Sequence, residues 1–251
     1  MTNGDLYYYW GMGQNVALVV MCQGFWALCY WLEHPAIEKY KALEEPWPWN
    51  SDDKETWNKL YWKTVCLYTF NIFILNPMLY APFLLDPSLP VPMDCSMEGL
   101  PSAFKLCGQM LFCMLMEDLI FHCSHRFLHR PWVYPYIHKI HHEHKVTIGL
   151  AASHAHPVEY LLGNVGPTIA GPLILGDRMH FLGVFTWYIL RTIEGIEGHS
   201  GYDFSWSAFR MLPFGSDFGY HAYHHSHNIG NYSSFFTIWD TVFGSNKAYY
   251  A

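Results

Sequence analysis

The chain has 251 residues, of which 51% are hydrophobic and 14% are charged, and its formal net charge at pH 7 is −7. Soluble domains typically carry about 25% charged residues, so this composition favours a membrane protein. The net charge of −7 gives no basic footprint for nucleic acid, and most of the seven cysteines sit in apolar runs, as buried hydrophobes do. We therefore expect one membrane-embedded domain over residues 1–251, with the lipid bilayer as partner.

Three apolar segments are long enough to cross a bilayer, which takes about 20 mostly apolar residues. They cover residues 12–32, 64–85 and 103–121. A fourth apolar stretch, residues 158–195, is divided by Gly176 and Asp177 into two pieces that are each short for a span. These patterns predict an all-α membrane bundle of about three full spans and a tight helical hairpin.

The distribution of Lys and Arg predicts the orientation of these spans. Residues 33–63 contain five lysines and residues 122–157 contain four basic residues, whereas the segment before the first span and residues 86–102 contain none. Basic segments are retained on the cytosolic side of membranes. We therefore expect a cytosolic, histidine-rich cap formed by residues 122–157 and 196–246.

The histidines are concentrated in this predicted cap. Fifteen of the sixteen lie between His122 and His227. His125 and His129 are four residues apart, and the pattern HxxHH occurs at residues 138–142 and again at 221–225. On a helix, positions i, i+3 and i+4 share one face. The spacing predicts three helical segments that each present a stripe of imidazoles.

Such stripes are unsuited to an apolar core, because each buried ring needs partners for its polar nitrogens. Neutral imidazole is, however, a common metal ligand. Eight histidines exceed the four ligands of one tetrahedral zinc and fit two metals of higher coordination number. His199 and His156 are candidates for a ninth and a tenth ligand. The predicted set is His125, His129, His138, His141, His142, His221, His224, His225, His199 and His156.

Several metal chemistries fit this set poorly. No cysteine falls inside the histidine patterns, which disfavours an iron–sulfur cluster or a cysteine-rich zinc site. The zinc-peptidase motif HExxH is absent, since Val146 stands where its second histidine would be. Imidazole also suits iron. Two irons at a membrane surface would suit activation of O₂ and oxidation of a lipid C–H bond.

The motifs as a set resemble the fatty acid hydroxylase/sterol desaturase superfamily, and within it the C4-methylsterol monooxygenases. The shared motifs are "HRFLH", "YIHKIHHEH", "AHPVE", "RTIEGIEGHSGYD" and the third histidine pattern with its tail, "GNY…WD…FG". The resemblance covers roughly residues 64–246. It implies a multi-pass enzyme of the endoplasmic reticulum with a non-haem site of two iron ions, whose electrons come from NAD(P)H through cytochrome b5 and its reductase. The ligands implied are the histidines named above.

Acidic residues near these motifs are candidates to orient the ligand imidazoles through their second ring nitrogen. They are Asp118, Glu117, Glu159, Glu194 and Glu197. Beyond the metal site itself, no separate catalytic residue is predicted.

Several readings stay open beside oxidation of a 4-methylsterol. The same histidine patterns serve other lipid hydroxylases and sterol desaturases. The chain could be an accessory subunit of a membrane complex that retains the fold, or a zinc-dependent membrane hydrolase. Because the ending "NKAYYA" differs from the lysine-rich retrieval tails of many relatives, another organelle membrane is also possible.

Overall fold

Three long apolar helices form the frame of the protein, as the sequence predicts. The computed structural model describes residues 3–86, 88–89 and 93–251, and in that part of the chain the regular elements are helical. The α-helices are α1 (Asn3–Leu32), α2 (Pro35–Glu38), α3 (Lys54–Phe70), α4 (Asn76–Leu85), α5 (Ala103–Leu128), α6 (Pro157–Glu159), α7 (Gly166–Leu175), α8 (Phe181–Glu197), α9 (Phe218–His227) and α10 (Ile238–Phe243). Short 3₁₀ segments are η1 (Pro48–Asn50), η3 (His141–Glu143), η4 (Gly149–Ser153) and η6 (Gly176–Arg178), and π-helical turns are η2 (Asn71–Leu75) and η5 (Tyr160–Val165).

The candidate membrane spans are Gly11–Leu32, Lys54–Pro82 and Ala103–Leu128. The second begins ten residues before the predicted 64–85, because the Asp53 carboxylate caps α3 by accepting a hydrogen bond from Thr56 N (3.1 Å). The third passes the predicted end at residue 121 and continues to Leu128. The three predicted segments are confirmed as helices that are long and apolar enough to cross a membrane, but their polar ends were missed because a search for apolar runs passes over them.

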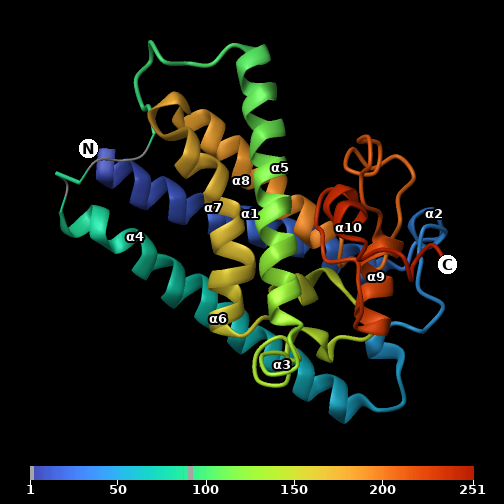
Figure 1. Cartoon of the computed structure of the whole chain (residues 1–251). Helices are drawn as coiled ribbons and strands as arrows, with labels where there is room; N and C mark the ends of the chain where they lie inside the picture. The colour runs from blue at the N-terminus through green and yellow to red at the C-terminus, as the bar shows by residue number, and fades with distance from the viewer. Residues whose placement is uncertain (1–2, 87, 90–92) are drawn as a thin grey trace.

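The helical hairpin also forms, and its two arms separate. Gly176, with φ of +54°, ends α7, and the chain turns through η6 into α8. Helix α7 packs along α5, where Gly171 lies so close to Cys113 that a Cβ atom would come within 2.9 Å of the Cys113 Cα. Helix α8 lies mainly against α1. Figure 1 shows the arms diverging from their shared turn, so the hairpin is open where the sequence predicted a tight one.

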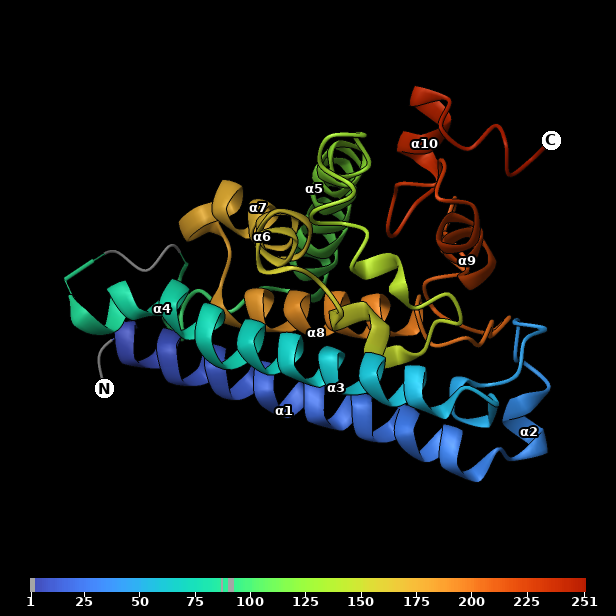
Figure 2. The ribbon, with the colours of Figure 1, turned by 90° about the horizontal axis from the view of Figure 1, so that it is seen from below.

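The helices lie in two crossing sets. Figure 2 views α5 and α7 nearly end-on, while α1, α3, α4 and α8 run across the picture. Helix α8 contacts both α1 and α5, and so joins the two sets. The end of α5, α9 and the segment between α5 and α6 meet beside α8 (Figure 1).

Contacts between connecting segments agree with spans that alternate in direction. Asp94 exchanges backbone hydrogen bonds with Met179 and Phe181 (3.0 and 2.7 Å), so the 93–102 segment meets the hairpin turn. Ala42 N donates to Gly201 O (3.0 Å), and Lys63 pairs with Glu143 (2.6 Å), so residues 33–63 meet the histidine-bearing segments. The segments predicted to share one membrane side are therefore packed together.

An aromatic cluster fixes one side of the histidine-bearing region. Trp26, Tyr30, Trp47 and Tyr202 are buried against one another. The Tyr30 hydroxyl donates to Ser200 O (2.7 Å) and accepts from Gly149 N (2.9 Å). This cluster thus links the first span to the chain beside His199.

Candidate metal centre

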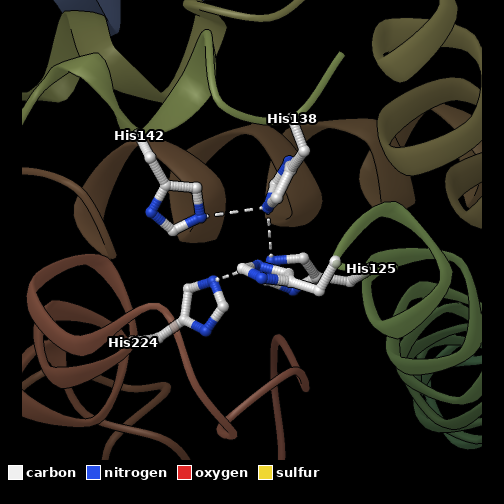
Figure 3. Close-up of side chains that lie close together, drawn as sticks. His125, His138, His142 and His224 are labelled. Carbon is white, nitrogen blue, oxygen red and sulfur yellow. Dashed lines mark hydrogen bonds between the residues drawn. The ribbon is translucent and has the colours of Figure 1, made fainter. Parts of the chain in front are cut away.

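Nine of the ten predicted histidines converge into two groups. In each group, one potential ligand atom per residue lies within 4.8 Å of every other. The first group contains His125, His129, His138, His142 and His224, and the second contains His141, His199, His221 and His225. Figure 3 shows four members of the first group with their rings turned toward a common centre.

The two HxxHH patterns divide their ligands between the groups. In the HxxHH pattern at residues 138–142, His138 and His142 belong to the first group and His141 belongs to the second. In the HxxHH pattern at residues 221–225, His221 and His225 belong to the second group and His224 belongs to the first. Each pair of adjacent histidines therefore serves both groups, which places the groups side by side. We expected the three histidines of each HxxHH pattern to share one face. Instead, the first and last histidines of each pattern belong to one group, and the histidine between them belongs to the other.

Two of the three ligand segments are helical, and one is not. His125 lies in the last turn of α5, His129 is its C-cap, and α9 carries His221, His224 and His225. Residues 131–140 instead form successive turns, followed by η3. The predicted helix is wrong there because Pro131 and Pro135 remove backbone donors from the segment.

Outer hydrogen bonds fix the tautomers of five imidazoles. The Nδ1–H groups of His125, His224, His199 and His141 donate to the carbonyl oxygens of Tyr232, Gly230, Gly195 and His154, at 2.9, 2.7, 2.8 and 3.3 Å. The His138 Nδ1–H donates to the Glu159 carboxylate at 2.6 Å. Backbone carbonyl oxygens only accept, so Nδ1 carries the proton in the first four rings, and an ionised Glu159 imposes the same tautomer on His138. The Nε2 atom of each ring is then an unprotonated acceptor.

These acceptors face one another at short range. The Nε2 atoms of His125 and His138 are 3.0 Å apart, and those of His141 and His199 are 3.3 Å apart. With both protons held on Nδ1, no hydrogen lies between the two nitrogens, so these pairs cannot be hydrogen bonds. Buried lone pairs that point at each other need a cation, and neutral imidazole nitrogen is a ligand for zinc, copper, iron or nickel. The donor set therefore fits two metal ions.

Burial keeps the imidazoles neutral. It lowers the pKa of His142 to about 3 and that of His199 to about 4. Desolvation also lowers the pKa of His141, His221 and His224 well below the usual value, and neighbouring histidines add to the shift. The rings are therefore ready to bind metal at neutral pH without first losing a proton.

One of the five predicted carboxylates contacts a histidine of the two groups. Glu159 is buried and accepts the His138 proton. His156, three residues earlier, lies outside both groups, and its Nδ1 accepts a hydrogen bond from Val158 N (3.1 Å). In the "AHPVE" motif, the histidine thus caps α6 while the glutamate reaches His138 of the first group.

The other four carboxylates brace the surrounding elements. Glu117 and Glu194 accept from the Arg191 guanidinium at 2.6 and 2.8 Å, which ties α5 to α8. Asp118 accepts from Ser234 N (2.8 Å), close in sequence to the Tyr232 carbonyl that holds His125. Glu197 hydrogen-bonds with Ser207. These acids support the backbone that orients the ligands.

Asp240 is a supporting residue that sequence reasoning missed. Its buried carboxylate accepts from Tyr232 N (2.9 Å) and Ser233 N (2.8 Å), and so fixes the loop whose carbonyls hold His125 and His224. Burial opposes ionisation, but hydrogen bonds from His122, Ser245 and the backbone outweigh it and hold the Asp240 pKa below its usual range. The "WD" within the motif tail was the available signal.

Two histidines outside the ligand pattern link the second span to the centre. The hydroxyl of Thr64 lies 2.9 Å from His144 Nε2 and 2.8 Å from His154 Nδ1. His154 also contacts Glu143 through Nε2 (3.1 Å) and accepts the His141 proton through its carbonyl. The chain of contacts holds η3 against α3.

A cavity of about 110 Å³ opens onto both groups. His125 and His138 line it from the first group, and His141, His199 and His221 line it from the second. It has room for several molecules of the size of water. A small reactant can therefore reach the faces of both groups.

The sequence model of the fatty acid hydroxylase family matches residues 110–245, more than half of the chain and nearly all of this site. A putative methylsterol monooxygenase of Dictyostelium discoideum is 34% identical over 86% of this chain and 76% of its own length. Methylsterol monooxygenase 1 of Gallus gallus is 34% identical over 86% of this chain and 69% of its own length.

A relative with another named activity is also similar. A very-long-chain aldehyde decarbonylase of Oryza sativa subsp. indica is 40% identical over 60% of this chain and 56% of its own length. No solved structure matches the chain.

Proposed function

Since the chain belongs to the fatty acid hydroxylase family, we propose that it is a membrane-bound, O₂-dependent oxidoreductase that oxidises the C4-methyl group of 4-methylsterols. The observation that carries the metal chemistry is the pair of adjoining imidazole groups whose Nε2 lone pairs face inward. The substrate assignment rests on relatives named methylsterol monooxygenases that align with most of the chain.

The proposed ligands are the nine histidines of the two groups. Two iron ions held there would supply the reductive activation of O₂ that C–H oxidation requires. The protein's own part is to keep each imidazole neutral, to hold the Nδ1 protons on outer acceptors and to align Nε2 with the metal. Glu159 contributes to this by holding the His138 proton.

Electrons for each turnover would come from NAD(P)H through cytochrome b5 and its reductase. A carrier must approach the histidine-bearing side, where Arg126, Arg130, Lys139 and Lys145 are exposed. These basic side chains suit an acidic partner surface. The same basic segments support a cytosolic orientation, with the endoplasmic reticulum as the proposed membrane.

Sterol profiling in a yeast strain that lacks its own C4-methylsterol oxidase tests this function. Expression of the full chain should lower the accumulated 4,4-dimethylsterols and restore sterols without C4 methyl groups. The His141→Ala variant, expressed at the same level, should not restore them, since it loses a ligand of the second group.

Unchanged 4,4-dimethylsterols in cells that contain the well-expressed chain would contradict the proposal. Consumption of long-chain aldehyde under the same conditions would favour the activity named in the rice relative. Recovery of the chain in a stable complex without turnover would favour an accessory subunit.

A further inference from the structure

A second, larger cavity lies among the membrane helices. Its volume is about 320 Å³, within the range of roughly 300–1,000 Å³ that is usual for small-molecule pockets. Residues of α1, α4, α7 and α8 line it, and most of the lining is apolar, including Val19, Leu79, Ile169 and Leu173. Its walls include two of the candidate spans, so an apolar ligand could reach it from the bilayer.

Both π-helical turns found in the described part of the chain, η2 and η5, border this cavity. Ile72 lines it from η2, and Tyr160, Asn164 and Val165 line it from η5. The Tyr160 hydroxyl donates to Asn76 Oδ1 (2.7 Å) and joins the two walls. Since π-turns are rare and are found frequently at functional sites, their pairing around one cavity points to ligand binding.

This membrane cavity adjoins the cavity at the histidines. Asn164, Arg191, Gly195 and Ala152 line both spaces, and they therefore form the neck between them. A ligand in the membrane cavity would reach the metal centre past these four residues.

One polar group in the neck is unused. Arg191 is held by Glu117 and Glu194. Among the residues that the structure describes, by contrast, none makes a hydrogen bond with the side-chain amide of Asn164. An amide that lines a largely apolar cavity gains from a ligand with a matching polar group. A hydroxyl can both donate to the amide oxygen and accept from its nitrogen.

We propose that the membrane cavity binds the apolar body of a lipid alcohol, and that Asn164 binds its hydroxyl group at the neck, next to the carbon to be oxidised. This rests on the proposed function in one respect: a 4-methylsterol carries its hydroxyl on the carbon beside C4. Binding of that hydroxyl at Asn164 would direct the neighbouring methyl group toward the histidines. Asn164 is then a residue that determines specificity.

Binding to the purified, full-length chain without metal tests the pocket apart from catalysis. The probes are a tritiated 4,4-dimethyl-3-hydroxysterol and its 3-deoxy analogue, with the protein in lipid nanodiscs. One hydrogen bond should favour the hydroxysterol by roughly 3- to 10-fold in Kd. In Asn164→Leu this ratio should fall to about one, whereas Leu162→Ala, an exposed residue of the same π-turn, should keep the wild-type ratio.

A filled cavity gives a second, independent variant. Ile169→Trp should weaken the binding of both sterols by about tenfold or more, because the added rings occupy the pocket. Ile174→Trp makes the same change on the same helix at an exposed position and should bind as wild type does. Metal content after reloading should be equal in both variants, which shows that each has folded.

The proposal is overturned if Ile169→Trp binds sterol as wild type does, or if Asn164→Leu keeps the preference for the hydroxysterol. These outcomes are distinct from failure of the proposed function. If the wild-type chain binds the hydroxysterol as expected but never oxidises it, the proposed binding pocket holds and the proposed function is refuted. If the Asn164→Leu and Ile169→Trp variants oxidise sterol as well as wild type does, the proposed function holds and the proposed binding pocket is refuted.

Discussion

At the scale of single residues, the centre depends on where ring protons are held. Each of five imidazoles places its Nδ1 proton on an outer acceptor, and four of those acceptors are backbone carbonyls. Such acceptors cannot be found by reading side chains in the sequence. Glu159 is the exception, because its acceptor is a side chain.

Replacement of Glu159 by Leu should therefore weaken metal binding at the first group. The His138 proton would lose its acceptor, so the ring could change tautomer or rotate. Loss of such an outer partner typically costs 10- to 100-fold in metal affinity or activity. Glu159→Gln keeps an acceptor oxygen and should recover much of that loss. Competition with a chelator measures the affinity, and equal affinity in Glu159→Leu and wild type would refute the role.

The buried imidazoles also predict how stability depends on pH. Their pKa values in the folded state, about 3 for His142 and about 4 for His199, lie below the unfolded value of about 6.5. Between these values the unfolded chain binds more protons, so the free energy of unfolding decreases as the pH falls. Each group contributes up to about 1.4 kcal/mol per pH unit.

The metal-free protein should thus have a constant Tm between pH 8 and 7 and a falling Tm below about pH 6.5. Thermal unfolding in nanodiscs measures this. A Tm that stays level down to pH 5 would mean that the histidines are not buried as neutral groups.

At the scale of elements, spacing predicted which histidines gather but not how they divide. The i, i+4 pairs could be read from the sequence, whereas the assignment of His141 and His224 to opposite groups depends on how the segments dock. The turns before η3 replace a predicted helix because two prolines interrupt the segment. His156 could not be told from a ligand by type, because a histidine before proline can also cap a helix.

The close crossing of α5 and α7 should be sensitive to one methyl group. In Gly171→Ala, the new Cβ would meet Cys113 Sγ at 2.8 Å and Cα at 2.9 Å, so the helices would have to separate. Overpacking of this kind costs about 1–3 kcal/mol. Gly108→Ala, on α5 with nothing within 4 Å of the new Cβ, is the matched control.

A lower Tm is therefore expected for Gly171→Ala, and an equal or higher Tm for Gly108→Ala, because alanine favours helix. Equal losses in the two variants would show that α5 and α7 do not approach as closely as described.

At the scale of the whole molecule, alternation of charge along the chain predicted which segments lie together. The contacts of Lys63 with Glu143 and of Asp94 with Met179 agree with that prediction. The crossing of α5 and α7 over the other helices could not be predicted from the sequence, since it depends on packing at positions such as Gly171.

Cysteine labelling tests the orientation. In sealed microsomes whose cytosolic face is outward, a membrane-impermeant maleimide should label Lys139→Cys directly. Glu98→Cys should react only after the membrane is permeabilised. Both positions are exposed, so access depends on the side of the membrane. Labelling of Glu98→Cys alone in intact vesicles would reverse the proposed topology.

We propose that the two imidazole groups serve O₂-dependent oxidation of a methylsterol. The most direct measurement follows isotopically heavy O₂ into the product formed from a 4,4-dimethylsterol by the purified, iron-loaded chain with its electron donors. We predict a C4-hydroxymethyl sterol that carries one heavy oxygen atom, and no such product from the His141→Ala variant. Product that forms without O₂, or whose new oxygen comes only from water, would contradict the account.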